Sequence, residues 1–587
     1  MTPEWLQLLG TYKKRAGRLG LWLTFLAAVA SGCEGPPARS KPWRHAPEPR
    51  AQHARGPAGP VLAGERARLR TMAAAADTLT VWLDSDVRDL SPLAAPTVWS
   101  LRIAEDAVFE ALVRYRPGES DAQPGGYEPV LARSWRVLAD GREIAFELRD
   151  AVRFHDGRAL EAADVAWSIE AARRAHGRTG ELADVAAVEA AGPRTVRVRL
   201  ARATSYALRA LAEVPIVPAP RSRARSASAA APGGTAASAA PPEGSPAAGA
   251  GGPELVGTGP FRVRERDGGG GTITLERFAG YWGAKPRLAR IVYRYEPDAA
   301  AALRLARAGE IDVIPALIRE HYPEQARLAA AAGLAPLRMQ PPELRYLALN
   351  TRHPPFDDAR VRCALARQVD RSALVAARKG LVRAAGGAIW PGGPGDGPAM
   401  EAPPHDPAGA AALLDQAGWR QRDREGLRAR GSQRMTVTVL VSDRADNERD
   451  RVLEQLRGAG LALDVRVGTP GFLDGRLRDG RFDAAFVEWR ALPGEDLTSV
   501  YGTGGARNFG GFSDARVDES LARLRQAWDA AARWREMRQL GALLAETCPV
   551  VPLVAPDPHG LISRRVRGAT PRGGWLPVRD AALAGSP

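Results

Sequence analysis

The chain has 587 residues, of which 45% are hydrophobic, and its formal net charge is +15. This length is enough for several domains with buried cores. The first 70 residues hold 12 Lys or Arg against 4 Asp or Glu. No dense basic stripe with interleaved aromatic residues follows them, so nucleic acid is not an expected partner. Three cysteines are too few for a disulfide scaffold or a four-cysteine zinc site.

The amino terminus has the layout of an export signal. A basic stretch, Lys13–Arg18, precedes the apolar run Leu19–Ala30, which is too short to span a bilayer comfortably. The small residues Ser31 and Gly32 before Cys33 resemble a bacterial lipobox, whose cysteine is diacylated and becomes the first residue of the mature protein. We expect residues 1–33 to be a lipoprotein-type signal peptide with Cys33 lipidated. An uncleaved anchor and an ordinary signal peptide are the alternatives.

Residues 34–76 are rich in Pro, Arg and Ala and lack periodicity, which predicts a disordered tether. Beyond them, alternating segments indicate strands and apolar residues three or four apart indicate helices, so we expect layered α/β domains. The expected strands are Thr78–Leu83, Ile144–Leu148, Val196–Leu200, Thr272–Leu275, Ile291–Tyr295, Thr436–Val441 and Leu463–Val467. The expected helices are Asp164–Ala172, Ala359–Arg367, Pro407–Ala417 and Arg533–Ala545.

One stretch interrupts this pattern. Residues 221–253 contain 28 Ala, Gly, Ser or Pro among 33 residues and no Leu, Ile, Val or aromatic residue. Such a composition cannot build a core, and it predicts a disordered surface insert.

Three short motifs have structural interpretations. Gly257-Thr258-Gly259-Pro260 predicts a turn that leads into a strand, with the glycines supplying positive φ. His155-Asp156-Gly157 contains a possible His–Asp pair for base catalysis, but Asp-Gly after an alternating strand is typical of a turn. Asp357 or Asp358 is expected to cap a helix that begins near Ala359.

Catalytic and metal-binding patterns are not found in the sequence. It has no Gly-x-Ser-x-Gly elbow and no His-Glu-x-x-His zinc pair, so we expect no enzyme activity, cofactor or metal. Cys363 and Cys548 lie among apolar residues in segments with helical spacing. We interpret them as buried free thiols, and the alternative is a disulfide formed after export.

An ordered series of motifs lies within residues 77 to 567. The motifs are Tyr127–Trp135, Phe146–Arg149, Val152–Gly157, Gly257–Phe261, Leu275–Arg277 with Tyr281–Gly283, Ala308–Asp312, Leu347–Thr351, Pro355–Asp358 and Ala417–Trp419. This series resembles the family 5 extracytoplasmic solute-binding proteins, which are the oligopeptide-, dipeptide- and nickel-binding proteins of ABC importers.

The resemblance implies an α/β, bilobal periplasmic-binding-protein fold of type II, in its large three-domain variant. Lobe I would combine residues 77–117, 206–314 and 550–587 and would contain the insert 221–253. Residues 118–205 would form a small extra domain, and residues 315–549 would form lobe II. Two such lobes close over a ligand at a hinge.

The family also suggests ligand-binding residues. In peptide-binding members, a strand-end tryptophan is followed three residues later by an aspartate that pairs the α-ammonium group of the ligand. Trp489 matches this tryptophan, but the aspartate position holds Leu492. Glu495 or Asp496 could supply the missing carboxylate, because a buried ammonium group needs one.

Other candidates surround this strand. Arg490 could favour an anionic group of the ligand instead. Asn508 and Phe512, with Phe509 between them, occupy a segment that often reaches the cleft in this family. The alternative for the charged candidates is that they are solvated loop residues.

The resemblance therefore implies a monomeric, membrane-anchored lipoprotein of the periplasm or cell surface. It would capture a peptide or a related small solute and deliver it to the permease subunits of an ABC importer. A ligand-presenting sensor without transport, a binder of a non-peptide solute and a secreted enzyme with an unrecognised site are the alternatives.

Overall fold

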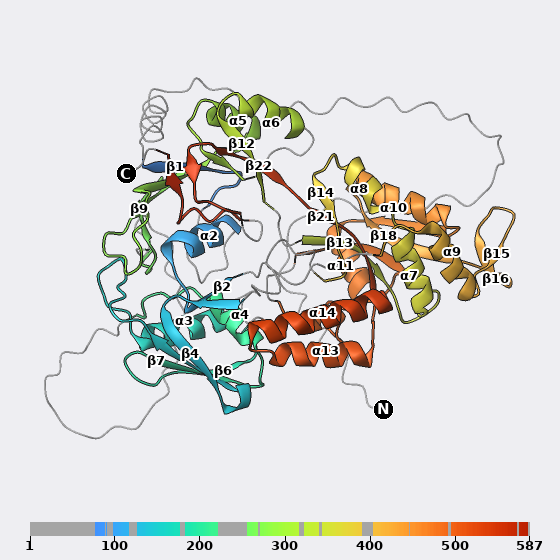
Figure 1. Cartoon of the computed structure of the whole chain (residues 1–587), viewed down its shortest axis with the longest axis horizontal. Coiled ribbons are helices and arrows are strands. Elements are labelled where there is room, and N and C mark those ends of the chain that lie inside the picture. Colours follow the sequence, from blue (N-terminus) through green and yellow to red (C-terminus); the bar gives the residue numbers. More distant parts are fainter. Residues whose placement is uncertain are drawn as a thin grey trace, which may run out of the picture. The chain divides into compact units, whose positions relative to one another are not determined.

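The computed structural model describes residues 77–87, 90, 98–116, 126–175, 182–220, 255–267, 271–315, 322–339, 343–389, 403–444, 446–490, 495–571 and 575–584. The expected signal peptide, tether and insert lie outside these residues. Three sheets organise the described part of the chain (Figure 1).

The first sheet has seven strands in the order β12-β22-β11-β1-β10-β9-β8. Its central strand β1 is buried along its whole length and pairs in parallel with β10 and β11. The strands are β1 (Thr78–Leu83), β8 (Phe261–Arg266), β9 (Thr272–Arg277), β10 (Arg290–Tyr295), β11 (Val313–Ile314), β12 (Leu334–Arg338) and β22 (His559–Ser563). The helices that follow its strands or pack near it are α2 (Val98–Ile103), the π-helical turn η1 (Ala104–Val108), α5 (Ala299–Arg307) and α6 (Tyr322–Ala330).

The second sheet has six strands in the order β14-β21-β13-β20-β18-β19. In β18, Val437, Val439 and Val441 belong to one hydrophobic core while Leu440 belongs to another. This alternation places the two cores on opposite faces, because successive side chains of a strand point to opposite sides. The strands are β13 (Glu343–Leu349), β14 (Val382–Ala384), β18 (Thr436–Ser442), β19 (Ala462–Gly468), β20 (Ala484–Arg490) and β21 (Val550–Pro556).

Separate sets of helices supply these two cores. Helices α7 (Ala359–Gln368), α8 (Arg371–Ala377), α9 (Pro407–Gln416) and α10 (Asn447–Gly458) contribute buried side chains to the first core. Helices α11 (Pro470–Arg478), α12 (Thr498–Tyr501), α13 (Ala515–Gln526) and α14 (Ala530–Thr547) contribute to the second. Figure 1 shows α13 and α14 side by side.

The third sheet is antiparallel, with the order β4-β5-β7-β6. Helix α3 packs Val165, Ile169 and Ala172 into its core, and a capping box between Glu161 and Asp164 fixes the start of the helix. The elements are β4 (Ala132–Leu138), η2 (Ala139–Gly141), β5 (Glu143–Leu148), α3 (Ala162–Arg174), β6 (Val185–Ala190), β7 (Thr195–Leu200) and α4 (Tyr206–Ala212).

Short strand pairs and one small sheet complete the described fold. The pairs are β2 (Val113–Arg116) with β3 (Gly126–Pro129) and β23 (Val566–Arg567) with β24 (Ala582–Leu583). The small sheet contains β15 (Gln421–Arg422), β16 (Arg428–Arg430) and β17 (Gln433–Arg434).

The predicted α/β class and all the predicted strands and helices are confirmed, with boundaries that extend by one to three residues or end one residue earlier. The division into lobes remains a prediction. The chain passes from one sheet to the other at different residues from the predicted lobe boundaries, because β12 belongs to the first sheet and β21 to the second. On this basis the chain passes between the two sheets after Arg338 and again between Pro556 and His559.

The turn at Gly257 and Gly259 forms where it was predicted, but for a different reason. Neither glycine has positive φ. A Cβ at Gly257 would lie 2.0 Å from the Val108 carbonyl oxygen, and one at Gly259 would lie 2.4 Å from the Ala107 carbonyl oxygen. Glycine is therefore needed here for close approach of two backbone segments.

His155 belongs to this turn and not to a catalytic pair. The Gly257 N–H donates to His155 Nδ1 at 3.2 Å, so Nε2 carries the proton and donates to the Gly259 carbonyl at 3.0 Å. Burial lowers the pKa of His155, which favours the neutral ring. Asp156 pairs with Arg158, and Gly157 has positive φ, as the predicted turn requires.

The interpretation of Cys363 and Cys548 as free thiols is wrong, because they form a disulfide. Cys363 lies on α7, and Cys548 caps the end of α14. Arg362 helps to hold the two elements together, since its guanidinium donates to the Thr547 carbonyl at 2.8 Å and the Phe356 carbonyl at 2.8 Å. The cysteines are 185 residues apart, so their spacing could not show that the fold brings them together.

Candidate ligand-binding site

Trp489 lies near the end of β20, in the hydrophobic core to which α11–α14 contribute. The strand pairs with β13, which places Trp489 opposite Leu344 and Arg490 opposite Glu343. The indole is 4% exposed, packs edge-on against Tyr501 at 6.3 Å between centroids, and its N–H has no acceptor among the described residues. The guanidinium carbon of Arg507 lies 5.8 Å from the indole centroid.

Arg507 connects Trp489 to the predicted residue Glu495. Its Nη2 group forms an ion pair with Glu495 and donates to Ser499 Oγ at 2.8 Å. Burial lowers the pKa of Arg507. The Glu495 carboxylate is therefore already paired with a positive charge of the protein.

Asp496 is committed as well. One carboxylate oxygen pairs with Arg525 Nη2 at 2.7 Å, and the other accepts from the Thr498 N–H at 2.9 Å. An incoming ammonium group would have to break an existing ion pair at either acid. Leu492, where the expected aspartate is missing, lies outside the described residues.

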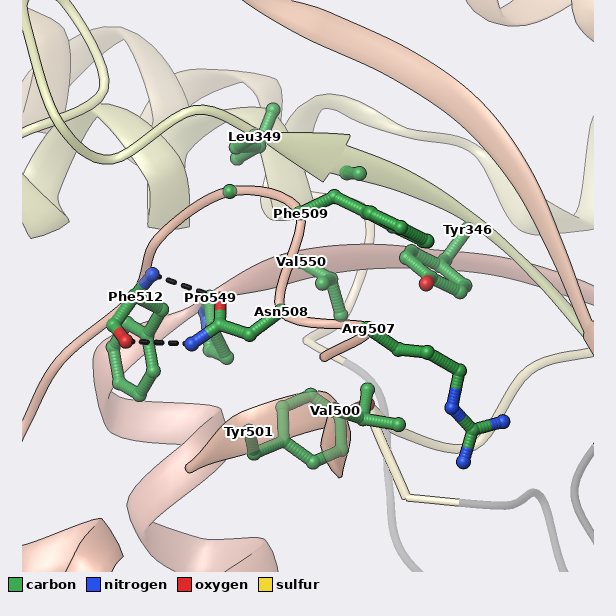
Figure 2. Close-up of a pocket in the computed structure, with 12 residues that line it drawn as sticks. Tyr346, Leu349, Val500, Tyr501, Arg507, Asn508, Phe509, Phe512, Pro549 and Val550 are labelled. Carbon is green, nitrogen blue, oxygen red and sulfur yellow. Dashed lines mark hydrogen bonds between the residues drawn. The ribbon is translucent and has the colours of Figure 1, made fainter. Parts of the chain in front are cut away.

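Asn508 and Phe512 line a small cavity of about 20 Å³ beside this cluster (Figure 2). Both donors of the Asn508 amide are used, because they bond to the Gly502 carbonyl at 2.9 Å and the Phe512 carbonyl at 2.7 Å. Its oxygen accepts from the Phe512 N–H at 2.9 Å. The cavity is also lined by Tyr346, Ala348, Leu349, Val500, Tyr501, Arg507, Phe509, Gly510, Pro549 and Val550.

Arg490 does not line this cavity, and its ion-pair partner is Glu343. It is 59% exposed and lies 3.5 Å from Glu343, which is buried. Burial, followed by the neighbouring carboxyl of Glu488, raises the pKa of Glu343 to about 7. Near neutral pH this carboxyl is therefore only partly ionised, and it balances the charge of Arg490 incompletely.

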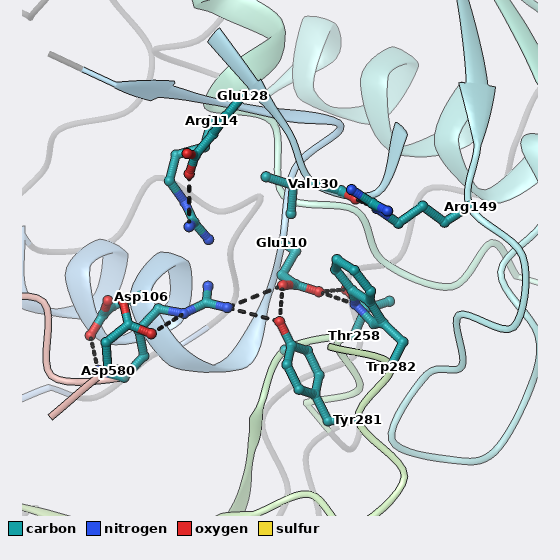
Figure 3. A network of polar contacts seen from close by, with 12 residues as sticks. Asp106, Glu110, Arg114, Glu128, Val130, Arg149, Thr258, Tyr281, Trp282 and Asp580 are labelled. Carbon is teal, nitrogen blue, oxygen red and sulfur yellow. Dashed lines mark hydrogen bonds and ion pairs between the residues drawn. The ribbon is translucent and has the colours of Figure 1, made fainter. Parts of the chain in front are cut away.

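A second polar centre surrounds the buried carboxylate of Glu110 (Figure 3). It accepts from the Tyr281 hydroxyl at 2.8 Å, the Trp282 indole N–H at 2.8 Å and the Thr258 hydroxyl at 3.2 Å. Arg579 lies 3.4 Å from the same carboxylate and donates to the Tyr281 oxygen at 2.9 Å. This network joins segments that are far apart in the sequence, and its fully used carboxylate indicates a structural role.

The residues that the structure describes contain no metal-binding group and no membrane-spanning helix. There, no three His, Cys, Asp or Glu side chains are grouped so that they could hold a metal ion. Among the same residues, no helix is both long and apolar enough to cross a bilayer.

The structure thus brings Trp489, Glu495, Asn508 and Phe512 into one neighbourhood, with Asp496 two residues before α12. It places Arg490 on a different set of contacts. Sequence reasoning missed Arg507, which connects Trp489 to Glu495, although this residue directly precedes the predicted Asn508. It also missed Tyr346, which lines the cavity from β13 and carries no local signal of such a role.

Comparisons with known proteins place this site in context. Residues 126–511 match the model of the bacterial extracellular solute-binding proteins, family 5 Middle. The chain is 26% identical over 536 residues to probable di/tripeptide-binding protein 5 of Pseudomonas aeruginosa (strain UCBPP-PA14), covering 84% of this chain and 93% of that protein. It is also 26% identical over 431 residues to the nickel-binding periplasmic protein of Escherichia coli (strain K12), covering 70% and 75%.

The fold has matches among solved structures. HbpA2 from Haemophilus parasuis superimposes with a TM-score of 0.71 at 20% identity, covering 86% of this chain and 99% of that chain. NikA from Brucella suis, solved in complex with Fe(III)-EDTA, gives a TM-score of 0.66 at 23% identity, covering 86% and 99%. At these identities the likeness shows a common fold.

Proposed function

Because the chain belongs to the family 5 bacterial extracellular solute-binding proteins, we propose that it captures a small solute outside the cytoplasm and delivers it to an ABC importer. The family match over residues 126–511 is the observation that carries this proposal. Membership also argues against an enzyme, since proteins of this family bind substrates for ABC transporters. A sensor that presents the same ligand without transport is the alternative.

The solute we propose is a peptide or a related compound without a free α-ammonium group near Trp489. The di/tripeptide-binding relatives support the peptide class. The sequence has Leu492 where peptide-binding members have aspartate, and the structure commits Glu495 to Arg507 and Asp496 to Arg525. A buried ammonium group without a carboxylate would be strongly disfavoured.

Calorimetry with matched tripeptides tests this preference. Unmodified trialanine should bind at least tenfold more weakly than N-acetyl-trialanine. Acetylation removes the positive charge of the α-ammonium group, for which no unpaired carboxylate is available in this site. Leu492→Asp should reduce the difference in affinity between the two peptides. Submicromolar binding of ordinary di- or tripeptides by the wild type would contradict the preference, and weak binding of every peptide would favour a non-peptide solute.

We also propose that Cys33 carries the lipid that anchors the protein to a membrane. The support is the basic stretch, the short apolar run and the small residues before this cysteine. Cys33→Ser should release the protein from the membrane fraction, since two acyl chains give a stable anchor. The anchor proposal fails if the variant still sediments with membranes and the wild type incorporates no labelled palmitate.

A further inference from the structure

A half-buried arginine with no ion-pair partner among the described residues lies on α2, near the first sheet. Arg102, on α2, stacks near two tryptophans, with its guanidinium carbon 5.8 Å from the Trp99 centroid and 5.2 Å from the Trp575 centroid. In the part of the chain that the structure describes, no carboxylate lies within ion-pair distance of Arg102 and its guanidinium donates no hydrogen bond. A guanidinium in this environment loses hydration without gaining an acceptor.

The surroundings of Arg102 are fixed by other contacts. The Trp99 indole N–H donates to Asp84 at 2.6 Å, and the two indoles pack edge to face with centroids 5.4 Å apart. The Trp575 indole N–H is buried and has no acceptor among the described residues. Two unpaired donors, a guanidinium and an indole N–H, are thus held beside each other.

The positive charge of Arg490, on the second sheet, also acts on Arg102. Burial and then the charge of Arg490, at the end of β20, lower the pKa of Arg102 to about 10, while Asp84 acts in the opposite direction. Arg490 follows Trp489 directly, and its own partner Glu343 is only partly ionised near neutral pH. The two like charges repel each other unless an anion lies between them.

We propose that Arg102, held beside Trp99 and Trp575, binds a carboxylate of the solute. Guanidinium groups suit this role because their paired N–H donors match the two oxygens of a carboxylate. The proposal rests on the solute-binding function and names the charge of the ligand. It also accounts for a guanidinium beside two tryptophans that has no ion-pair partner among the described residues.

The test uses the full-length protein and two probes, N-acetyl-trialanine as the free acid and as the carboxy-terminal amide. Calorimetry should show that the wild type binds the acid at least tenfold more tightly. Arg102→Gln should weaken binding of the acid at least tenfold and that of the amide less than twofold. The control Arg430→Gln removes an exposed arginine that also stacks on a tryptophan, Trp419 at 4.8 Å, and should change neither affinity.

Thermal unfolding separates this role from a structural one. Arg102→Gln should leave the melting temperature of the ligand-free protein unchanged or raise it, because an uncompensated charge is removed. The proposal is overturned if Arg102→Gln keeps the wild-type ratio of acid affinity to amide affinity, whether or not its melting temperature falls. If neither peptide binds the wild type, the proposal that the solute is a peptide fails, but the carboxylate site can still be tested. Succinate and succinamide then replace the two peptides as probes. Equal binding of each probe by wild type and variant overturns the carboxylate site.

Discussion

Replacing Glu110 with alanine should lower the free energy of unfolding by about 3–5 kcal/mol, the usual cost of removing one partner of a buried ion pair. Arg579 would lose its carboxylate, and the N–H of Trp282 and the hydroxyls of Thr258 and Tyr281 would lose their acceptor. The carboxylate has almost no exposed surface, so water cannot replace it without rearrangement.

The network also explains where the damage should appear. Arg579 belongs to the carboxy-terminal segment, and the backbone N–H of its neighbour Val578 donates to Asp106 at 2.8 Å. Burial raises the pKa of Asp106 to about 6. Loss of Glu110 should therefore loosen the carboxy-terminal segment from η1, which hydrogen exchange of residues 575–584 would detect.

Glu128→Ala is the matched control. Glu128 also pairs with an arginine, Arg114 at 3.2 Å, but both side chains are 41% exposed. Such a surface pair contributes about 1 kcal/mol or less. Urea unfolding followed by circular dichroism measures both variants, and equal losses in Glu110→Ala and Glu128→Ala would show that the buried network adds nothing.

Breaking the disulfide should cost about 2–5 kcal/mol, at the upper end of the range for natural disulfides because the loop that it closes is long. The bond joins residues 185 positions apart, so it restricts most of the chain that forms the second sheet while that chain is unfolded. The double variant Cys363→Ser/Cys548→Ser and the reduced wild type should show the same loss.

The comparison between these two samples serves as the internal control. A loss in the double variant without any loss on reduction would assign the effect to the serine hydroxyls, because Cys548 is buried. Two reactive thiols in the denatured, unreduced protein would contradict the disulfide itself. Hydrogen exchange should become faster in α7 and α14 and stay unchanged in β4–β7 of the third sheet.

The fold was predictable from the sequence wherever one face of an element is buried and the pattern is local. Thr436–Val441 has a valine at every second position, and the strand β18 forms there. Pro407–Ala417 begins with a proline and follows Asp406, and both residues are signals for the start of a helix. Helix α9 forms there with Asp406 as its cap.

Features that depend on distant segments were not predictable in this way. The disulfide needs α7 and the end of α14 to meet, and no spacing rule indicates this. The same holds for the glycines at 257 and 259, whose need for close approach to Val108 and Ala107 exists only in the folded chain. Trp489 was found through a family pattern, whereas Trp99 and Trp575 are brought together only by the fold.

Native mass spectrometry of gently purified protein tests most directly whether this chain is a solute-binding protein. We predict one non-covalent small solute per chain, released on unfolding, regained when the refolded protein is offered the same extract, and unchanged in mass after prolonged incubation. A protein that retains and regains no solute, or that converts the bound compound into one of different mass, would contradict this account.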